Sequence, residues 1–185
     1  MTREVMWWAW NDPGLEHLRR AVRDSVAVAD GVVLGVADGR PFRLAYEARC
    51  DSRWRVRYAR VGTLGEPPKV ELVSDGEGNW EGADGRALAY LRGCRYVDIF
   101  ATPFANTLPI RRLAPGESAD IFVAYFDETD LQPWPEPQRY AFLGKDDRGG
   151  LYRFLGLDRG FTADLRVDPD GLVVDYPGLF RRAFH

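Results

Sequence analysis

Aspartate–glycine dipeptides recur along the chain, and they limit its fold more than any other feature. Glycine accepts the positive φ angle that tight turns require, so Asp-Gly between apolar segments predicts a β-hairpin. Turn signals every ~8–12 residues, with side chains alternating between them, indicate an antiparallel all-β meander or barrel. The dipeptides in question are Asp30-Gly31, Asp38-Gly39, Asp75-Gly76, Asp84-Gly85 and Asp170-Gly171.

Apolar and charged residues alternate most clearly between Phe42 and Cys50, and again between Trp54 and Tyr58. Each of these segments therefore has one apolar and one charged face, and the two are expected to pair as antiparallel strands. Residues 15 to 29 fit either a helix or a strand, and a strand is favoured because strands surround them. Further strands are expected around Trp7 to Trp10 and at 69 to 73, 138 to 144, 151 to 155, 161 to 167 and 172 to 176.

Two segments depart from this alternation. Ile121 to Phe126 is apolar on both faces, which suggests a strand that is covered on both sides. The segment from Leu131 to Pro137 contains three prolines, so a stiff loop or crossover is expected there.

One helix is expected, just after a short apolar strand that begins at Cys94. The Thr102 hydroxyl can cap the first turn, and Pro103 suits the first helical position. Phe104 and Leu108 fall on one face, and Pro109 should end or kink the helix. The predicted fold is one mostly-β domain, residues 1–185, in which a long antiparallel sheet or barrel-like meander wraps around this single short α-helix.

Composition narrows the classes of function. A net charge of -3 and a pI near 5.5 argue against nucleic acid as the partner. The N-terminal apolar run is too short for a signal peptide, and no segment has the ~20 apolar residues of a membrane helix. A soluble, cytoplasmic protein is expected, with Cys50 and Cys94 as buried free thiols. His17 and His185 are the only histidines, which disfavours serine-nucleophile catalysis and a transition-metal site, so no cofactor is expected.

Carboxylates placed in apolar strands are the remaining chemical signal. Asp98 and Asp175 interrupt such strands, and Asp164 lies on the polar face of another. A buried acid needs a partner, so Asp98 and Asp175 either form a site or pair with arginines such as Arg111. Both interpretations stay open at this stage. The other arginines considered as partners are Arg112 and Arg139.

Aromatic residues also allow two interpretations, because six tryptophans and eight tyrosines could fill a core or line a groove. Trp80 is the best candidate for a groove, since it lies in a glycine-rich hairpin where little core is expected.

Several motifs resemble those of a family described as "putative glycolipid-binding", a bacterial family of unknown function. The central segment Thr102 to Leu113 and the segment Gly171 to Phe180 carry most of the resemblance, and Ala105 stands where threonine is more common. The other matching motifs are Cys50-Asp51-x-x-Trp54-Arg55, Asp75-Gly76-x-Gly78-x-Trp80, Gly93-Cys94-x-x-Val97-Asp98-Ile99 and Gln138-Arg139-Tyr140. The resemblance implies a long sheet around one helix, a homodimer, a remote likeness to lipoprotein-localisation factors, and an acidic pocket for a glycolipid head group.

The favoured hypothesis is a protein that binds a glycolipid or similar amphiphile, with a possible role in glycolipid metabolism. An enzyme that acts on a sugar-containing substrate through two carboxylates, Asp98 with Asp175 or Asp164, is the alternative. A third hypothesis is an interaction protein that dimerises through Ile121 to Phe126. The expected ligand-binding residues are Asp98, Asp164, Asp175, Tyr176, Trp80, Asn106 and Arg111.

Overall fold

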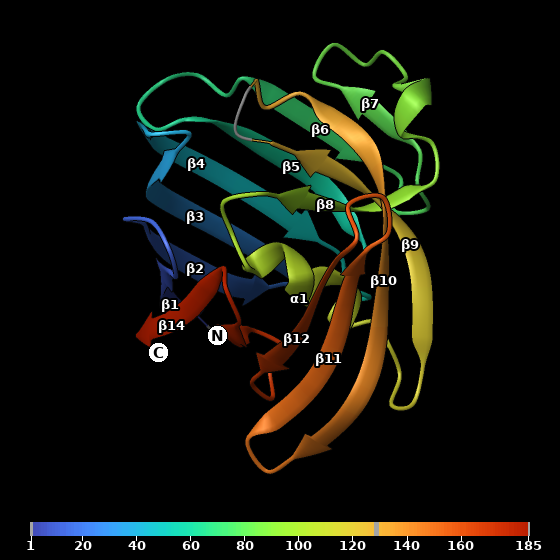
Figure 1. The fold of residues 1–185 in the computed structure, drawn as a ribbon. Helices are drawn as coiled ribbons and strands as arrows, with labels where there is room; N and C mark the ends of the chain where they lie inside the picture. The colour runs from blue at the N-terminus through green and yellow to red at the C-terminus, as the bar shows by residue number, and fades with distance from the viewer. Residues whose placement is uncertain (1, 128–129, 185) are drawn as a thin grey trace.

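The computed structural model describes residues 2–127 and 130–184, and their strands form one sheet (Figure 1). The order across the sheet is β7-β6-β5-β4-β3-β2-β1-β14-β13-β12-β11-β10-β9-β8. The strands are β1 (Thr2–Ala9), β2 (Leu15–Arg23), β3 (Val26–Ala37), β4 (Arg40–Cys50), β5 (Val56–Thr63), β6 (Val70–Ser74), β7 (Trp80–Gly82), β8 (Cys94–Ile99), β9 (Ser118–Phe126), β10 (Pro133–Asp146), β11 (Gly149–Gly156), β12 (Phe161–Val167), β13 (Val173–Tyr176) and β14 (Phe180–Phe184). The 3-10 helix η1 spans Ala89–Leu91, and the α-helix α1 spans Phe104–Ile110.

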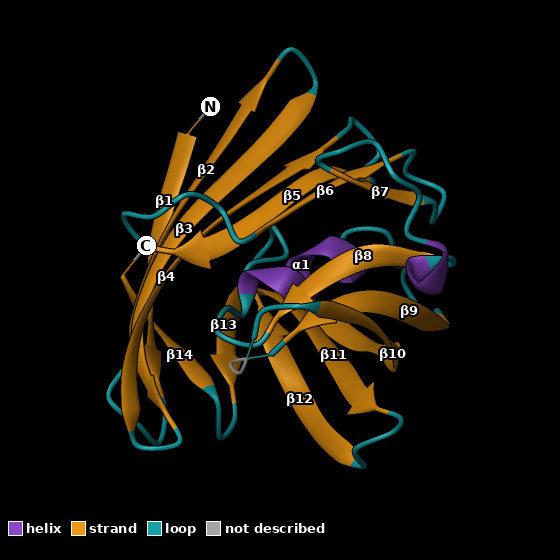
Figure 2. Ribbon diagram, turned by 90° about the horizontal axis from the view of Figure 1, so that it is seen from above, coloured by secondary structure: helices purple, strands orange, loops and turns teal. Residues whose placement is uncertain are grey.

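The sheet is a curved meander whose two halves meet where the first and last strands pair. β1 pairs antiparallel with β14, and the pairing of β8 with β9 is parallel. Every other pair of neighbours is antiparallel. Figure 2 shows the sheet bent around α1, which lies in the hollow. The predicted mostly-β architecture around one helix is therefore confirmed.

The helix is a core element, as expected. All seven of its residues are buried. The Phe104 amide donates to the Thr102 hydroxyl at 3.0 Å, so Thr102 supports the first turn from just before it. The helix ends at Ile110, one residue beyond Pro109, which agrees with the expected stop.

Four of the five Asp-Gly dipeptides lie in turns, but the prediction for Asp30-Gly31 is wrong. These residues lie inside β3, where Gly31 pairs with Tyr46. A Cβ at Gly31 would lie 2.2 Å from the Tyr46 ring, so this glycine is needed to admit an aromatic ring. The turn before β3 is instead made by Asp24 and Ser25, with φ angles of 48° and 66°. The strand expected over residues 15 to 29 is thus the β2–β3 hairpin.

The prediction of a loop or crossover from Leu131 to Pro137 is also wrong, because β10 begins at Pro133. Pro133, Pro135 and Pro137 alternate along the strand, so their nitrogens all face the same side. This part of β10 pairs with β9, and the ladder to β11 begins only at Gln138. Proline is tolerated in a strand where its nitrogen faces an unpaired edge, so the spacing of two lets this segment join the sheet.

The β9 strand is covered less completely than its apolar sequence suggests. Val123, Ala124 and Phe126 are buried, whereas Phe122 is 51% exposed.

The two cysteines are buried free thiols, as predicted. No helix in the described part of the chain is long and apolar enough to cross a membrane.

Candidate functional site

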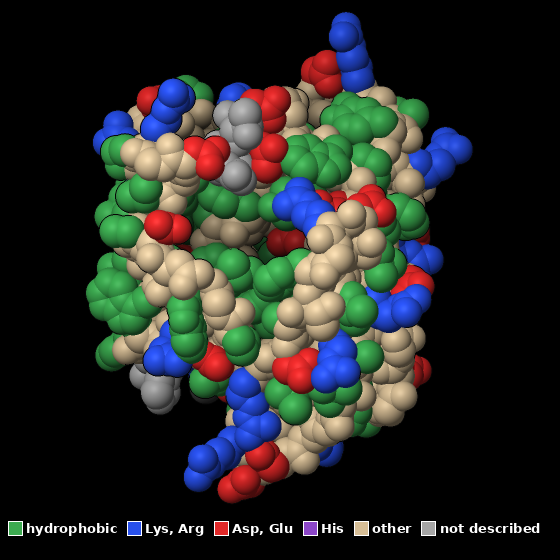
Figure 3. All heavy atoms as spheres, in the orientation of Figure 1, with side chains coloured by type: hydrophobic (Ala, Val, Ile, Leu, Met, Phe, Trp, Pro, Cys, Tyr) green, Lys and Arg blue, Asp and Glu red, His purple; other side chains and the backbone are tan. Residues whose placement is uncertain are grey.

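A cavity of about 370 Å³ lies between α1 and the strands that curve around it. We call it the acid cavity. Figure 3 shows a hollow on this face, with acidic atoms at its floor and hydrophobic side chains around it. The lining residues are Asp98, Ile99, Phe100, Thr102, Asn106, Tyr125, Glu136, Gln138, Phe154, Gly156, Arg159, Phe161, Tyr176, Leu179 and Phe180.

Asp98 is the acid that β8 brings into this cavity. Its Oδ2 accepts a hydrogen bond of 2.6 Å from the Gln138 side-chain amide on β10. Burial, with a smaller contribution from the charge of Glu136, raises the pKa of Asp98 to about 6, although the Gln138 hydrogen bond and the Arg159 charge oppose the rise. At neutral pH Asp98 is therefore mostly an ionised acceptor.

Glu136 is the second acid of the cavity, and it forms an ion pair. Its Oε2 lies 2.9 Å from Nη2 of Arg159, and the Glu136 side chain is 6% exposed. Burial raises the pKa of Glu136, and Arg159 counteracts that shift. The Arg159 guanidinium also lies 4.5 Å from the centre of the Tyr125 ring, which fixes the cation at the cavity wall.

Hydrogen bonds hold the buried polar groups of this cavity in a fixed array. The Tyr140 hydroxyl donates to Oδ1 of Asn106 on α1 at 2.8 Å, and it lies 3.4 Å from Oε1 of Gln138. Gln138 in turn donates to Asp98. Tyr140, Asn106 and Gln138 are all buried and partnered, so the helix and strand β10 together orient the half-buried Asp98 carboxylate on β8.

The opposite wall of the cavity is aromatic. The Tyr176 ring centre lies 6.2 Å from those of Phe154 and Phe161 and 6.1 Å from that of Phe180. Burial raises the pKa of Tyr176, so its hydroxyl stays neutral and can act as donor or acceptor. The cavity thus offers hydrogen-bonding groups on one side and apolar rings on the other.

Three of the seven residues expected at the site line this cavity: Asp98, Asn106 and Tyr176. Two expected acids are elsewhere. Asp164 binds Arg153 through two hydrogen bonds of 2.7 and 2.9 Å. Asp175 faces Arg181 at 3.5 Å. Both are salt-bridged, and the partner of Asp175 is none of the three arginines named from the sequence. One of those three, Arg139, pairs with Asp120 instead.

The remaining two residues also lie outside the cavity. Arg111 donates to the carbonyl of Asp170, and its guanidinium lies 4.1 Å from the centre of the Trp54 ring. Trp80 is 2% exposed, and its indole N–H donates to the Cys94 carbonyl at 2.6 Å. The expectation that little core surrounds Trp80 is therefore wrong.

Sequence reasoning missed Glu136, Gln138 and Arg159 as members of the site. Glu136 and Gln138 share one face of β10, and both are buried. The spacing of two was present in the sequence, but the interleaved prolines concealed it. Arg159 lies in the turn after β11, where no local pattern marks its role.

A curved sheet around a buried helix, with an acid-lined and aromatic internal cavity, describes a class of protein suited to holding a small molecule inside its sheet. The chain belongs to the family described as "putative glycolipid-binding", which matches residues 4–182.

A crystal structure of a DUF1089 family protein from Pseudomonas aeruginosa is similar, with 36% identity, 95% of each chain covered and a TM-score of 0.77. A comparison with curated proteins gives no match. The expected homodimer stays a prediction.

Proposed function

We propose that the protein binds the polar head group of a glycolipid, or of a related amphiphile, in the acid cavity. The observation that carries this proposal is the Asp98 carboxylate, which Gln138 orients in a cavity that aromatic rings also line. Carboxylates accept hydrogen bonds from sugar hydroxyls, and aromatic rings pack against the apolar face of a sugar. The family to which the chain belongs supports the same ligand class.

Native mass spectrometry of the purified protein, followed by calorimetric titration with octyl glucoside and a monohexosyl diacylglycerol, tests this proposal. Asp98→Asn should weaken sugar binding by about tenfold or more, because a hydrogen bond to a charged group is worth more than a neutral one. Asp164→Asn is the matched control, since that acid is salt-bridged away from the cavity. Equal affinities for both variants, or no bound amphiphile at all, would contradict head-group binding at Asp98.

The alternative hypothesis, an enzyme that uses Asp98 with Asp175 or Asp164, is less well supported, because neither of the last two residues lines the acid cavity. Asp164 and Asp175 face arginines outside the acid cavity, so neither is brought beside Asp98. We therefore favour binding over catalysis.

A further inference from the structure

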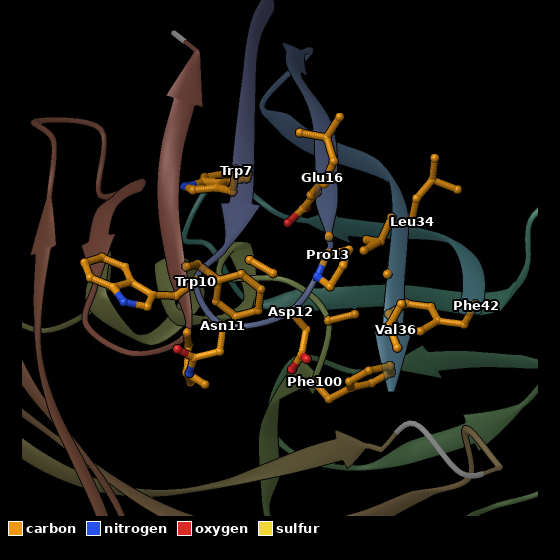
Figure 4. Close-up of a pocket in the computed structure, with 18 of the residues that line it drawn as sticks. Trp7, Trp10, Asn11, Asp12, Pro13, Glu16, Leu34, Val36, Phe42 and Phe100 are labelled. Atoms are coloured by element: carbon orange, nitrogen blue, oxygen red, sulfur yellow. The ribbon is translucent and has the colours of Figure 1, made fainter. Parts of the chain in front are cut away.

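A second cavity, of about 170 Å³, lies next to the acid cavity (Figure 4). We call it the Glu16 cavity. The two cavities share Phe100, Leu179 and Phe180 as lining residues. The second cavity is chiefly apolar, and its lining includes Trp7, Val33, Phe42, Phe100 and Glu16.

Aromatic rings give this cavity its apolar surface. The ring centres of Phe42 and Phe100 lie 5.3 Å apart. Gly35 makes room for Phe42, since a Cβ there would lie 2.6 Å from that ring. The Trp7 indole N–H already donates to the Val173 carbonyl at 2.8 Å, so Trp7 offers the cavity only carbon surface.

Glu16 is the buried acid of this lining, whereas the other two polar side chains, Asn11 and Asp12, are exposed. Glu16 is 2% exposed and lies on the inward face of β2. Its Oε1 accepts hydrogen bonds from the hydroxyls of Tyr46 at 2.5 Å and Thr102 at 2.7 Å. Its Oε2 has no partner, and Figure 4 shows the side chain running from its strand toward the centre of the cavity.

The hydrogen bonds decide where the proton of Glu16 resides. Burial raises the pKa of Glu16 to about 8, so the carboxyl is mostly neutral at pH 7. Because Oε1 already accepts two hydroxyl hydrogens, the proton belongs on Oε2. An unpaired donor in an apolar cavity is unfavourable, and a ligand oxygen would relieve that cost.

We propose that the Glu16 cavity holds the start of the amphiphile's acyl chain, with the Glu16 carboxyl donating a hydrogen bond to the carbonyl oxygen of the ester or amide linkage. This inference rests on the proposed function, because it extends a ligand whose head group lies in the acid cavity. Thr102 lines the acid cavity and donates to Glu16, so the linkage would lie at the junction of the two cavities.

The composition of the Glu16 cavity favours a carbonyl over the other possible occupants. An apolar cavity of about 150 Å³ in another protein stays dry and binds benzene, so 170 Å³ suits a short alkyl segment. A buried water needs two to four polar partners. Among the described residues, Glu16 Oε2 is the unpartnered buried side-chain atom that this cavity offers.

The test uses two sugar-free probes, methyl hexanoate and hexylammonium, titrated into the intact protein at pH 7 and followed by NMR. Methyl hexanoate should bind more tightly than hexylammonium, because the neutral Glu16 carboxyl can donate a hydrogen bond to the ester carbonyl but offers no negative charge to the ammonium group. Tighter binding of hexylammonium would overturn the proposal, because it would mean that Glu16 acts as an anion. Absence of binding by methyl hexanoate would also overturn it and leave water as the occupant.

Variants locate the probe and identify the donor. Glu16→Leu should weaken methyl hexanoate binding about fivefold, whereas Glu16→Gln, which keeps an N–H donor, should retain most of it. Val33 pairs with Glu16 across the β2–β3 ladder and lines the cavity. Val33→Phe should therefore block the probe, while Val32→Phe, on the exposed face of the same strand, should not.

If Glu16→Leu does not fold, Val33→Phe and Glu16→Gln still decide the matter. Unchanged affinity for methyl hexanoate in Val33→Phe would overturn the assignment of the cavity. Greater loss in Glu16→Gln than in Val33→Phe would overturn the role of the donor.

A sugar-bearing probe separates this inference from the proposed function. Asp98→Asn should weaken the binding of 6-O-hexanoylglucose and leave methyl hexanoate unaffected. If methyl hexanoate binds as described but Asp98→Asn does not affect the sugar ester, head-group binding at Asp98 fails and the acyl site remains. If instead Asp98→Asn weakens binding of the sugar ester but methyl hexanoate does not bind, the acyl site fails and head-group binding at Asp98 remains.

Discussion

Glu16 and Asp98 both lie inside the curved sheet, the first buried and the second half-buried, yet their surroundings give them opposite charge states. Burial raises the pKa of Glu16 to about 8 and that of Asp98 to about 6. The neighbours of each acid oppose its shift. The Gln138 amide and the Arg159 cation lower the pKa of Asp98, and the two hydroxyls that bind Glu16 lower the pKa of that residue. At pH 7 one acid is mainly an acceptor and the other mainly a donor. Burial is the largest cause of both shifts, and the acid that solvent reaches least, Glu16 at 2% exposed, keeps its proton to the higher pH.

The largest expected effect concerns the stability of the protein at alkaline pH. Between pH 4.5 and about 8 the folded state keeps the Glu16 proton that the unfolded state loses, so the free energy of unfolding falls as pH rises through this window. Glu16→Gln should remove this fall and make the protein more stable than wild type at pH 9, by roughly 3–5 kcal/mol. Urea unfolding at pH 5, 7 and 9 measures it. If the free energy of unfolding changed with pH in the same way in wild type and Glu16→Gln, Glu16 would not differ from Asp98 in charge state at pH 7.

The second-largest effect is expected from Tyr140→Phe, which interrupts the hydrogen-bond array that orients Asp98. Tyr140→Phe removes the hydroxyl that donates to Asn106, leaving a buried acceptor without its partner. We expect a loss of about 1–3 kcal/mol of stability, with Glu16-dependent behaviour unchanged. Chemical denaturation measures the loss, and the acid cavity should become less selective for sugars. A loss smaller than about 0.5 kcal/mol would mean that this hydrogen bond contributes little.

Ligand affinity should depend on pH through Asp98. Protonation removes the acceptor charge, so sugar binding should weaken about tenfold between pH 7 and pH 5, on either side of a pKa of about 6. Calorimetric titration of octyl glucoside at both pH values measures this. In Asp98→Asn the affinity should be nearly constant over that range. A wild-type affinity that rises on acidification would reverse the assigned roles of the two acids.

The smallest effect is expected from an acid on the outer face. Asp164 forms a well-ordered pair with Arg153, but both side chains are more than 40% exposed. Exposed ion pairs are typically worth less than about 1 kcal/mol, so Asp164→Asn should change stability slightly and binding not at all. Thermal unfolding and the same titration provide the measurement. Any clear loss of sugar affinity would extend the site beyond the acid cavity.

The antiparallel architecture, the short helix and the choice of Asp98 as a candidate site residue all came from the sequence. Turn residues and alternating side chains act over a few positions, and so do the capping threonine and Pro109. These local rules needed no knowledge of distant contacts. Asp98 could be singled out because an acid in an apolar strand must be explained.

The tertiary structure alone decided the rest, because each outcome depends on residues far apart in the chain. Gly31 lies in a strand since Tyr46, from the next strand, occupies its space. Asp164 and Asp175 face arginines, whereas Gln138 binds Asp98 and Glu136 lies in the same cavity. The direction of each strand within the curved sheet determines which of these partners each side chain meets. Glu16 is buried because β2 directs it inward, toward hydroxyls from β4 and the start of α1. A sequence specifies the alternation of a strand, but the fold determines what each face meets.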